Sequence, residues 1–114
     1  MVSKATLRYL RTSAQKTRLV VNQIRGRDVG DALAILKTST KRVARPIEKL
    51  LNSAIANSQN REERVDVDRL FVARAWVDEG PTEARGRAGT MGRYFPRLRR
   101  KAHVTLLLDV RTGK

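Results

Sequence analysis

The sequence predicts an α+β protein in which one strand, three helices and two further strands follow one another along the chain. Three observations predict this class. Apolar residues recur at helical spacing between residues 14 and 55, strand-forming residues gather at 1–11, 70–77 and 104–110, and an Arg-rich segment separates the last two strands. A length of 114 residues with 40% hydrophobic content suits a single domain, residues 1–114, with one modest core.

The N-terminal part predicts a strand followed by a helix. Residues 1–11 mix apolar residues, Thr and Tyr with basic ones, which is typical of a strand with one charged side. Ser13 is a suitable N-cap for a helix over about residues 14–25, which Gly26 would end. The apolar stripe of this helix is formed by Leu19, Val20 and Ile24.

Two more helices are expected before the chain returns to the sheet. Asp28 can cap a short helix that runs to about Lys37. Thr40 can cap a third helix, although Pro46 would kink it unless the helix starts nearer Arg45. This helix has the longest apolar stripe, formed by Val43, Ile47, Leu50, Leu51, Ala54 and Ile55. The polar residues 57–68 are expected to form a loop.

The last two strands, 70–77 and 104–110, flank the basic segment. The second of them places Val104, Leu106, Leu108 and Val110 on one face. If the two strands pair antiparallel, residues 80–102 become a hairpin extension with its midpoint at Met91-Gly92, projecting roughly 35 Å. An isolated two-stranded ribbon is marginal in water, so we expect the extension to become rigid only against a partner.

Basic residues dominate the charge. The net charge of +14 favours a polyanion as partner, and nucleic acid is preferred to an anionic membrane because the sequence has neither an apolar span nor a signal core. A cytosolic protein without an obligate homo-oligomer is expected, and the absence of cysteine agrees with a reducing compartment.

Two groups of cations are candidate RNA contacts. Guanidinium groups match phosphate oxygens and stack on splayed bases, and Tyr94 and Phe95 could add stacking surfaces. Against this stands the alternative of a merely solvated charged loop or helix face. The extension contributes Arg85, Arg87, Arg93, Arg97, Arg99, Arg100 and Lys101 against the single acid Glu83, and a second basic face on the body is expected from Lys4, Arg8, Arg11, Lys16, Arg18, Arg25 and Arg27.

Catalytic and cofactor sites are not indicated. His103 has no identifiable partner and is expected to be a strand residue, while Asp78 and Glu79 are adjacent and are better suited to turn or cap roles. The glycines at 86, 89 and 92 lack the Lys-Ser or Lys-Thr of a nucleotide-binding loop. Trp76 is expected to pack in the core. We therefore expect neither a metal nor a cofactor.

Several motifs together resemble the bacterial large-subunit ribosomal protein L twenty-two family. Their order and spacing extend over nearly the whole chain. They are Arg11-Thr12-Ser13-Ala14-Gln15-Lys16 with Arg18-Leu19-Val20, Ile24-Arg25-Gly26, Ser53-Ala54-Ile55-Ala56-Asn57, Val77-Asp78-Glu79-Gly80-Pro81, and His103-Val104-Thr105.

The resemblance implies three helices packed on a small antiparallel three-stranded sheet, with a long protruding β-hairpin. It also implies a structural, non-enzymatic constituent of the large ribosomal subunit that binds its RNA, including through Ser13, and supports assembly. Neighbouring ribosomal proteins would be partners, and the hairpin would line the exit tunnel and meet the nascent polypeptide. By position, the tip role falls to Thr90, Met91, Gly92 and Arg93.

Two other classes remain as alternatives. A free-standing nucleic-acid-binding regulator would read a DNA groove or bind as a symmetric dimer, and the sequence has neither a recognition-helix signature nor a zipper. An enzyme would lose turnover on replacement of His103 or Asp78, and no constellation of residues supports one.

Overall fold

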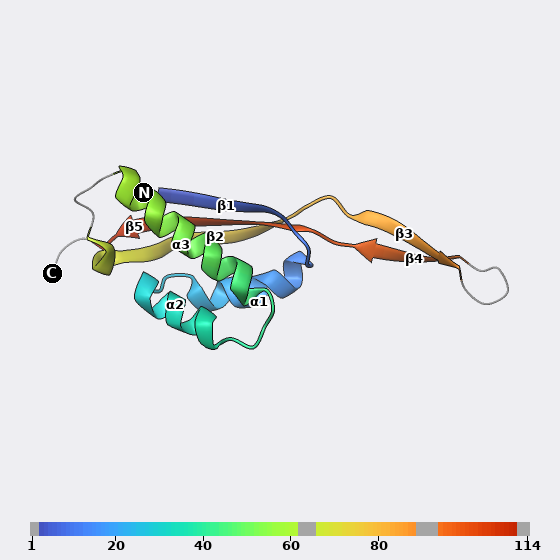
Figure 1. Cartoon of the computed structure of the whole chain (residues 1–114), viewed down its shortest axis with the longest axis horizontal. Coiled ribbons are helices and arrows are strands. Elements are labelled where there is room, and N and C mark those ends of the chain that lie inside the picture. The colour runs from blue at the N-terminus through green and yellow to red at the C-terminus, as the bar shows by residue number, and fades with distance from the viewer. Residues whose placement is uncertain (1–2, 62–65, 89–93, 112–114) are drawn as a thin grey trace.

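The computed structural model describes residues 3–61, 66–88 and 94–111, with the side chains of 83–98 left out. Along the chain, one strand precedes three helices and the remaining strands follow, as expected for the α+β class (Figure 1). The elements are β1 (Ser3–Leu10), α1 (Ala14–Ile24), α2 (Val29–Thr38), α3 (Ala44–Arg61), the short 3₁₀ turn η1 (Val67–Arg69), β2 (Leu70–Glu79), β3 (Glu83–Ala88), β4 (Tyr94–Arg99) and β5 (Ala102–Val110).

The strands form two antiparallel sheets. In the body, a three-stranded sheet has the order β1-β5-β2, and its central strand β5 pairs with both neighbours. Beyond the body, β3 and β4 pair only with each other, from Glu83 opposite Arg99 to Ala88 opposite Tyr94. We call this pair the ribbon; it extends away from the body along the long axis of the molecule (Figure 1). The predicted tip at 90–93 lies outside the described residues.

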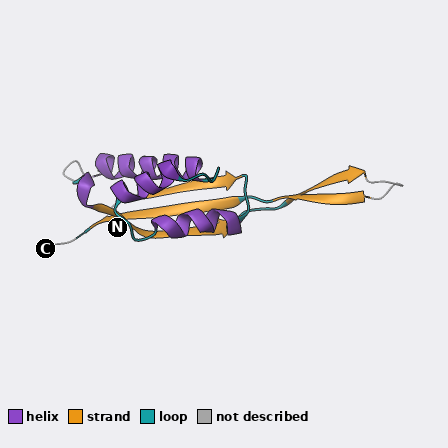
Figure 2. Cartoon of the chain, turned by 90° about the horizontal axis from the view of Figure 1, so that it is seen from below, coloured by secondary structure: helices purple, strands orange, loops and turns teal. Residues whose placement is uncertain are grey.

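The helices pack against one face of the body sheet (Figure 2). On β5, this face buries Ala102, Val104, Leu106 and Leu108, which are 0% exposed. Their apolar alternation was visible in the sequence. The core stripe predicted for α3 is also confirmed, since Ile47, Leu50, Leu51 and Ala54 are buried and Val43 and Ile55 are half-buried. On the opposite face, which we call the open face, Lys4, Thr6 and Arg74 are exposed.

The helix boundaries confirm some expectations and correct others. The Ser13 hydroxyl accepts a hydrogen bond from the Lys16 backbone N–H at 3.3 Å, so the predicted cap of α1 is confirmed. Of the two starts left open for the third helix, the one near Arg45 is confirmed and the cap at Thr40 is not, because α3 begins at Ala44. Pro46 therefore lies in the first turn, where its missing N–H leaves no helical bond unmade. The helix also continues to Arg61, well into the loop predicted from residue 57.

Two predicted core residues lie elsewhere. Leu19 is 52% exposed, because α1 buries the stripe formed by Ala14, Thr17, Val20, Val21 and Ile24. Trp76 is half-buried on the open face instead of in the core. A bulge between Val72 and Arg74 inserts one residue, so Ala75 and Val77 take the helix-facing positions and Trp76 is turned away.

The outer edge of β2 is covered by α1 and by the segment that follows it. The Gly26 N–H donates to the Val72 carbonyl at 2.9 Å, and the Val72 N–H donates to the Arg27 carbonyl at 2.9 Å. Gly26 reaches this position with φ of +80°, which glycine adopts without strain. Further along the strand, Arg25 donates to the Ala75 carbonyl through Nε and Nη2 at 3.0 and 2.7 Å, and Arg18 donates to the Val77 carbonyl at 2.9 Å.

Arg111, the residue after β5, binds the connection between α1 and α2. Arg111 donates through Nε to the Asp28 carboxylate and through Nη2 to the Gly26 carbonyl, and its guanidinium lies 4.4 Å from the centre of the Phe71 ring. Asp28 therefore occupies the predicted N-cap position of α2 but makes no side-chain cap hydrogen bond, because its carboxylate is used by Arg111.

Candidate nucleic-acid interface

An open cleft of about 870 Å³ lies where the ribbon meets the body. We call it the waist cleft. Three segments far apart in the sequence form it: the entry to α1, the end of β2 and the link from β4 to β5. A hydrogen bond of 2.8 Å from the Gly80 N–H to the Lys101 carbonyl holds the last two together. The lining residues are Arg11, Thr12, Ser13, Ala14, Gln15, Lys16, Glu79, Gly80, Thr82, Arg99, Arg100 and Lys101.

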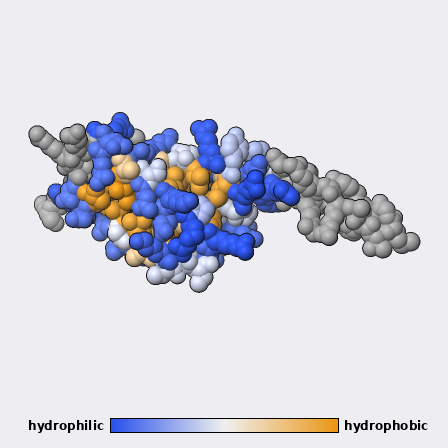
Figure 3. Space-filling view, in the orientation of Figure 1, coloured by the Kyte–Doolittle hydropathy of each residue, from blue (hydrophilic) through white to orange (hydrophobic). Residues whose placement is uncertain are grey.

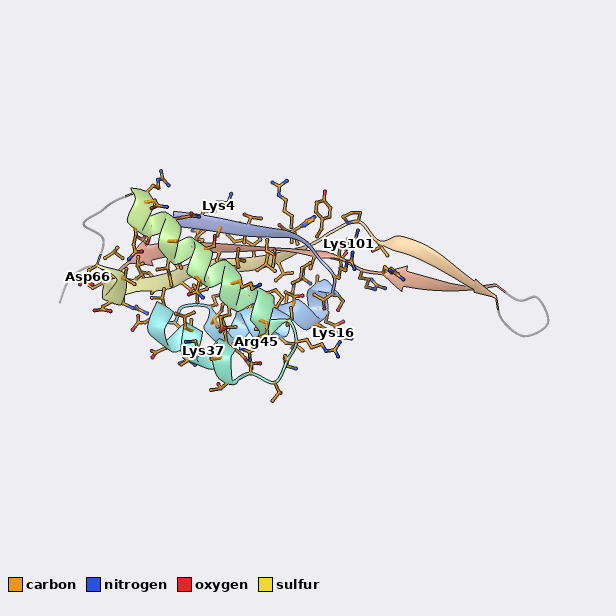
Figure 4. The ribbon with its side chains drawn as sticks, viewed as in Figure 1. Lys4, Lys16, Lys37, Arg45, Asp66 and Lys101 are labelled. Carbon is orange, nitrogen blue, oxygen red and sulfur yellow. The ribbon has the colours of Figure 1, made fainter. Side chains whose placement is uncertain are left out.

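Positive charge dominates the waist cleft. Arg11, Lys16, Arg99, Arg100 and Lys101 lie around it, and among the side chains that the structure describes Glu79 is the one carboxylate in the lining. All of these except Lys101 are exposed, and Lys101 is half-buried. Lys16 and Lys101 lie at the same end of the body, beside the base of the ribbon (Figure 4), and hydrophilic side chains surround this base on the surface (Figure 3). The positive end of α1 adds to the field.

The other basic residues of the body do not form the single face that the sequence predicts. Arg18 and Arg25 lie against β2 and donate to its carbonyls. Lys4 lies on the open face of the sheet, and Arg8 is exposed at the bulged end of β1. Arg27 borders a separate hollow beside α2, together with Ser39 and Lys41. Each of these cations could be identified in the sequence. Their distribution over different surfaces depends on the fold and could not be predicted.

The register of the ribbon places two of its arginines opposite each other. Arg85 is the register partner of Arg97, and Arg87 that of Phe95. Like charges directly opposite in a ladder destabilise it, unless an anion lies between or beside them. Arg93 and the other tip residues lie outside the described part of the chain.

Sequence reasoning missed several residues of the interface. The waist cleft is also lined by Thr12, Gln15 and Thr82, which the sequence did not indicate as RNA contacts. A neutral polar side chain gives no charge signal. Glu79 and its neighbour Asp78 were expected in a turn or cap, but both are exposed residues at the end of β2. Gly80 could have been recognised from its place between that strand and Pro81.

His103 has a structural partner. It lies in β5, as expected, and its Nδ1 accepts a hydrogen bond from the Tyr9 backbone N–H at 3.0 Å. Among residues 3–61, 66–88 and 94–111, no three His, Cys, Asp or Glu residues gather as a metal site would require. Within the same ranges, no helix combines the length and the apolar character needed to cross a bilayer.

The waist cleft is wide and open, and its charge continues onto a ribbon whose register brings arginines together. This geometry suits an extended anion better than a small substrate, so the waist cleft and the ribbon form a candidate polyanion-binding surface. Comparison with known proteins gives the family.

The chain belongs to the family described as ribosomal protein L22p/L17e, whose model matches residues 5–109. It is 53% identical over 106 residues to the large ribosomal subunit protein uL22 of Solibacter usitatus, covering 93% of this chain and 94% of the relative. The protein of the same name from Halothermothrix orenii is 44% identical over 109 residues, covering 96% of each chain. That from Anaeromyxobacter sp. is 47% identical over 100 residues, covering 88% of this chain and 68% of the relative. The resemblance stated from the motifs is confirmed.

Proposed function

We propose that this chain binds large-subunit ribosomal RNA through the waist cleft and the ribbon, and that its extended hairpin lines the nascent polypeptide exit tunnel. The chain is a ribosomal protein of the large subunit and a structural constituent, not an enzyme. Its location is the cytoplasm, within that subunit. Its partners are the RNA, neighbouring large-subunit proteins and, at the hairpin tip, the nascent polypeptide.

The convergence of five cations on the waist cleft carries this proposal. A phosphate backbone entering the cleft would meet Arg11 and Lys16 on one side and Arg99, Arg100 and Lys101 on the other. Each phosphate contact releases condensed counterions, so affinity should fall steeply with salt. Arginine forks also fix the orientation of phosphate oxygens, which a point charge alone does not.

The ribbon supports the second half of the proposal. Its strands have only each other as partners, and the register sets Arg85 opposite Arg97. An RNA wall on both sides would neutralise this charge and supply the burial that the ribbon lacks. Binding would thus order the hairpin along its length. Its tip, residues 90–93, would then lie in the subunit interior, at the tunnel wall.

A pair of charge-matched variants tests the interface. Lys16→Met with Arg100→Met removes two cleft cations, and Lys37→Met with Lys49→Met removes two exposed cations from α2 and α3. Binding of the full chain to large-subunit RNA transcribed in vitro is measured from 50 to 400 mM salt. The cleft pair should lower the slope of log affinity against log salt by roughly 0.7 to 0.9 for each phosphate that is no longer neutralised, and the control pair should not. Equal slopes for the two pairs would place the RNA elsewhere.

The cellular test is fractionation of lysate on a sucrose gradient after a high-salt wash, with the protein followed by mass spectrometry. Retention at near one copy per large subunit supports a built-in constituent. Release into the soluble fractions would instead favour a peripheral nucleic-acid binder or regulator.

A further inference from the structure

Tyr9 lies on the open face of the sheet, beside the waist cleft. It and Leu19 are the large hydrophobic side chains that are most exposed in the described part of the chain, at 56% and 52%. An isolated exposed apolar residue needs no explanation. Tyr9, however, has an unusual backbone conformation, and its ring contacts two side chains. No such features are found for Leu19 in the described part of the chain.

The backbone of Tyr9 is in the left-handed region, with φ of +59°. It is the one residue other than glycine with positive φ in the described ranges, and the conformation is unfavourable for a bulky side chain. A bulge in β1 between Leu7 and Leu10 creates it, and the hydrogen bond from the Tyr9 N–H to His103 Nδ1 holds it. Strain of this kind gathers at functional sites, where it aims a side chain.

The ring of Tyr9 is held in place by its neighbours. The His103 ring meets it edge to face, with 4.9 Å between centroids and 89° between planes. The Lys101 Nζ lies 5.8 Å from the ring centroid. We call Tyr9, His103 and Lys101 the Tyr9 platform. A ring fixed in this way and still more than half exposed can receive a second flat group at little cost in side-chain entropy.

The surroundings favour a nucleobase as that group. Lys101 belongs both to the platform and to the waist cleft. An RNA strand with its phosphates in the cleft would therefore have its neighbouring bases next to Tyr9. Asp78 is the register partner of His103 and is exposed on the same face. A carboxylate repels phosphate but accepts hydrogen bonds from base amino groups, so a base is better placed here than a phosphate.

We infer that Tyr9 stacks against an unpaired base of the large-subunit RNA, with the phosphates of the same strand lying toward Lys101 and the waist cleft. This inference rests on the proposed function, because it names the part of the RNA that the platform would receive. Aromatic stacking on splayed, unpaired bases is a common way for proteins to recognise RNA outside its helices.

The test compares the full chain with Tyr9→Ala, Tyr9→Phe and Leu19→Ala, using in vitro transcribed large-subunit RNA at several salt concentrations. Stacking releases few counterions, so Tyr9→Ala should weaken binding roughly tenfold at every salt concentration with an unchanged salt slope. Tyr9→Phe keeps the ring and should bind as the unaltered chain does. Leu19→Ala removes an equally exposed apolar side chain and should have no effect. Thermal unfolding shows whether each variant is folded. If the alanine variant is not, Tyr9→Asn takes its place, because Asn tolerates the left-handed backbone and also lacks the ring.

Each remaining outcome overturns the inference in a distinguishable way. If Tyr9→Ala binds within twofold of the unaltered chain, the platform does not stack on RNA while the proposed function stands. A lower salt slope in Tyr9→Ala would mean that a displaced cation, not the missing ring, explains the effect. If the unaltered chain has no salt-dependent affinity for the RNA, the proposed function and the inference fail together.

Discussion

The body sheet and the ribbon are both antiparallel ladders, yet they are held in different ways. In the body, β5 has a partner on each side and buries four residues completely under the helices. In the ribbon, β3 and β4 have one partner each, no described helix covers them (Figure 2), and Gly86 is paired with Pro96, which lacks a backbone donor. Backbone pairing alone therefore does not make a stable sheet. The body is stabilised by its own core, and the ribbon needs an external surface.

Amide hydrogen exchange should show the largest contrast. Core amides in β5 and α3 should exchange only through global unfolding, whereas amides at 83–88 and 94–99 should open locally, at least about a thousandfold faster relative to their intrinsic rates. Adding large-subunit RNA should slow the ribbon amides and leave the core unchanged. Strong protection of the ribbon without RNA would show that the ribbon is stable on its own.

Truncating the core should affect the free energy of unfolding strongly. Leu106→Ala removes a side chain that is 0% exposed in the central strand, and it should lower this free energy by about 2 to 5 kcal/mol. Leu19→Ala, on the surface, should change it by less than about 0.5 kcal/mol. Urea titration of both variants measures the difference. Similar losses would mean that β5 is not at the centre of the core.

At Gly80, where the body sheet meets the ribbon, one added methyl group should lower the free energy of unfolding. A Cβ at Gly80 would lie 3.2 Å from both His103 Nε2 and Lys101 Cβ. Overpacking of this kind costs about 1 to 3 kcal/mol, which exceeds the roughly 0.4 to 1 kcal/mol gained by restricting the unfolded chain. Gly80→Ala should therefore destabilise the protein by about 1 kcal/mol. Gly30→Ala is the control, because its Cβ would meet nothing within 4 Å and should stabilise α2.

The hydrogen bonds that cover the edge of β2 should contribute less to the free energy of unfolding. Arg25→Met removes both hydrogen bonds to the Ala75 carbonyl while keeping an aliphatic side chain. Because the side chain is exposed, the loss of unfolding free energy should be about 1 kcal/mol. Arg27→Met, two residues away, removes the same charge and should be nearly neutral in the same urea titration. An equal loss in the two variants would show that charge matters here and the carbonyl contacts do not.

Removing the ribbon should disturb the body least of all. Replacing residues 82–100 with an Asn-Gly turn keeps Lys101 and the body sheet, so the urea midpoint should correspond to a change below about 0.5 kcal/mol. Affinity for large-subunit RNA should nevertheless fall, because the deleted segment carries much of the basic charge. A variant that fails to fold would mean that the body depends on the ribbon.

Local patterns predicted most of the body. Ser13 and the α3 stripe report directly on capping and burial, and the family motifs are specific in order and spacing. The bulges escaped prediction because they depend on which residues of β5 lie opposite, and they decided the positions of Trp76 and Tyr9. The roles of Arg18 and Arg25 depend on carbonyls at least 50 residues away along the chain. For the waist cleft, each cation could be found in the sequence, but the meeting of three separate segments required the fold.

The covered edge of β2 has a consequence for the chain before it enters a ribosome. An uncovered edge strand offers a row of carbonyls and amides on which another copy can add a strand, and such additions lead to aggregates. Here the outward carbonyls of Val72, Ala75 and Val77 are occupied from within the same molecule. Two of the three donors are arginines, whose charge also repels an approaching copy. The chain is thus protected against strand addition at this edge, and stays available for assembly, while its RNA is still being made.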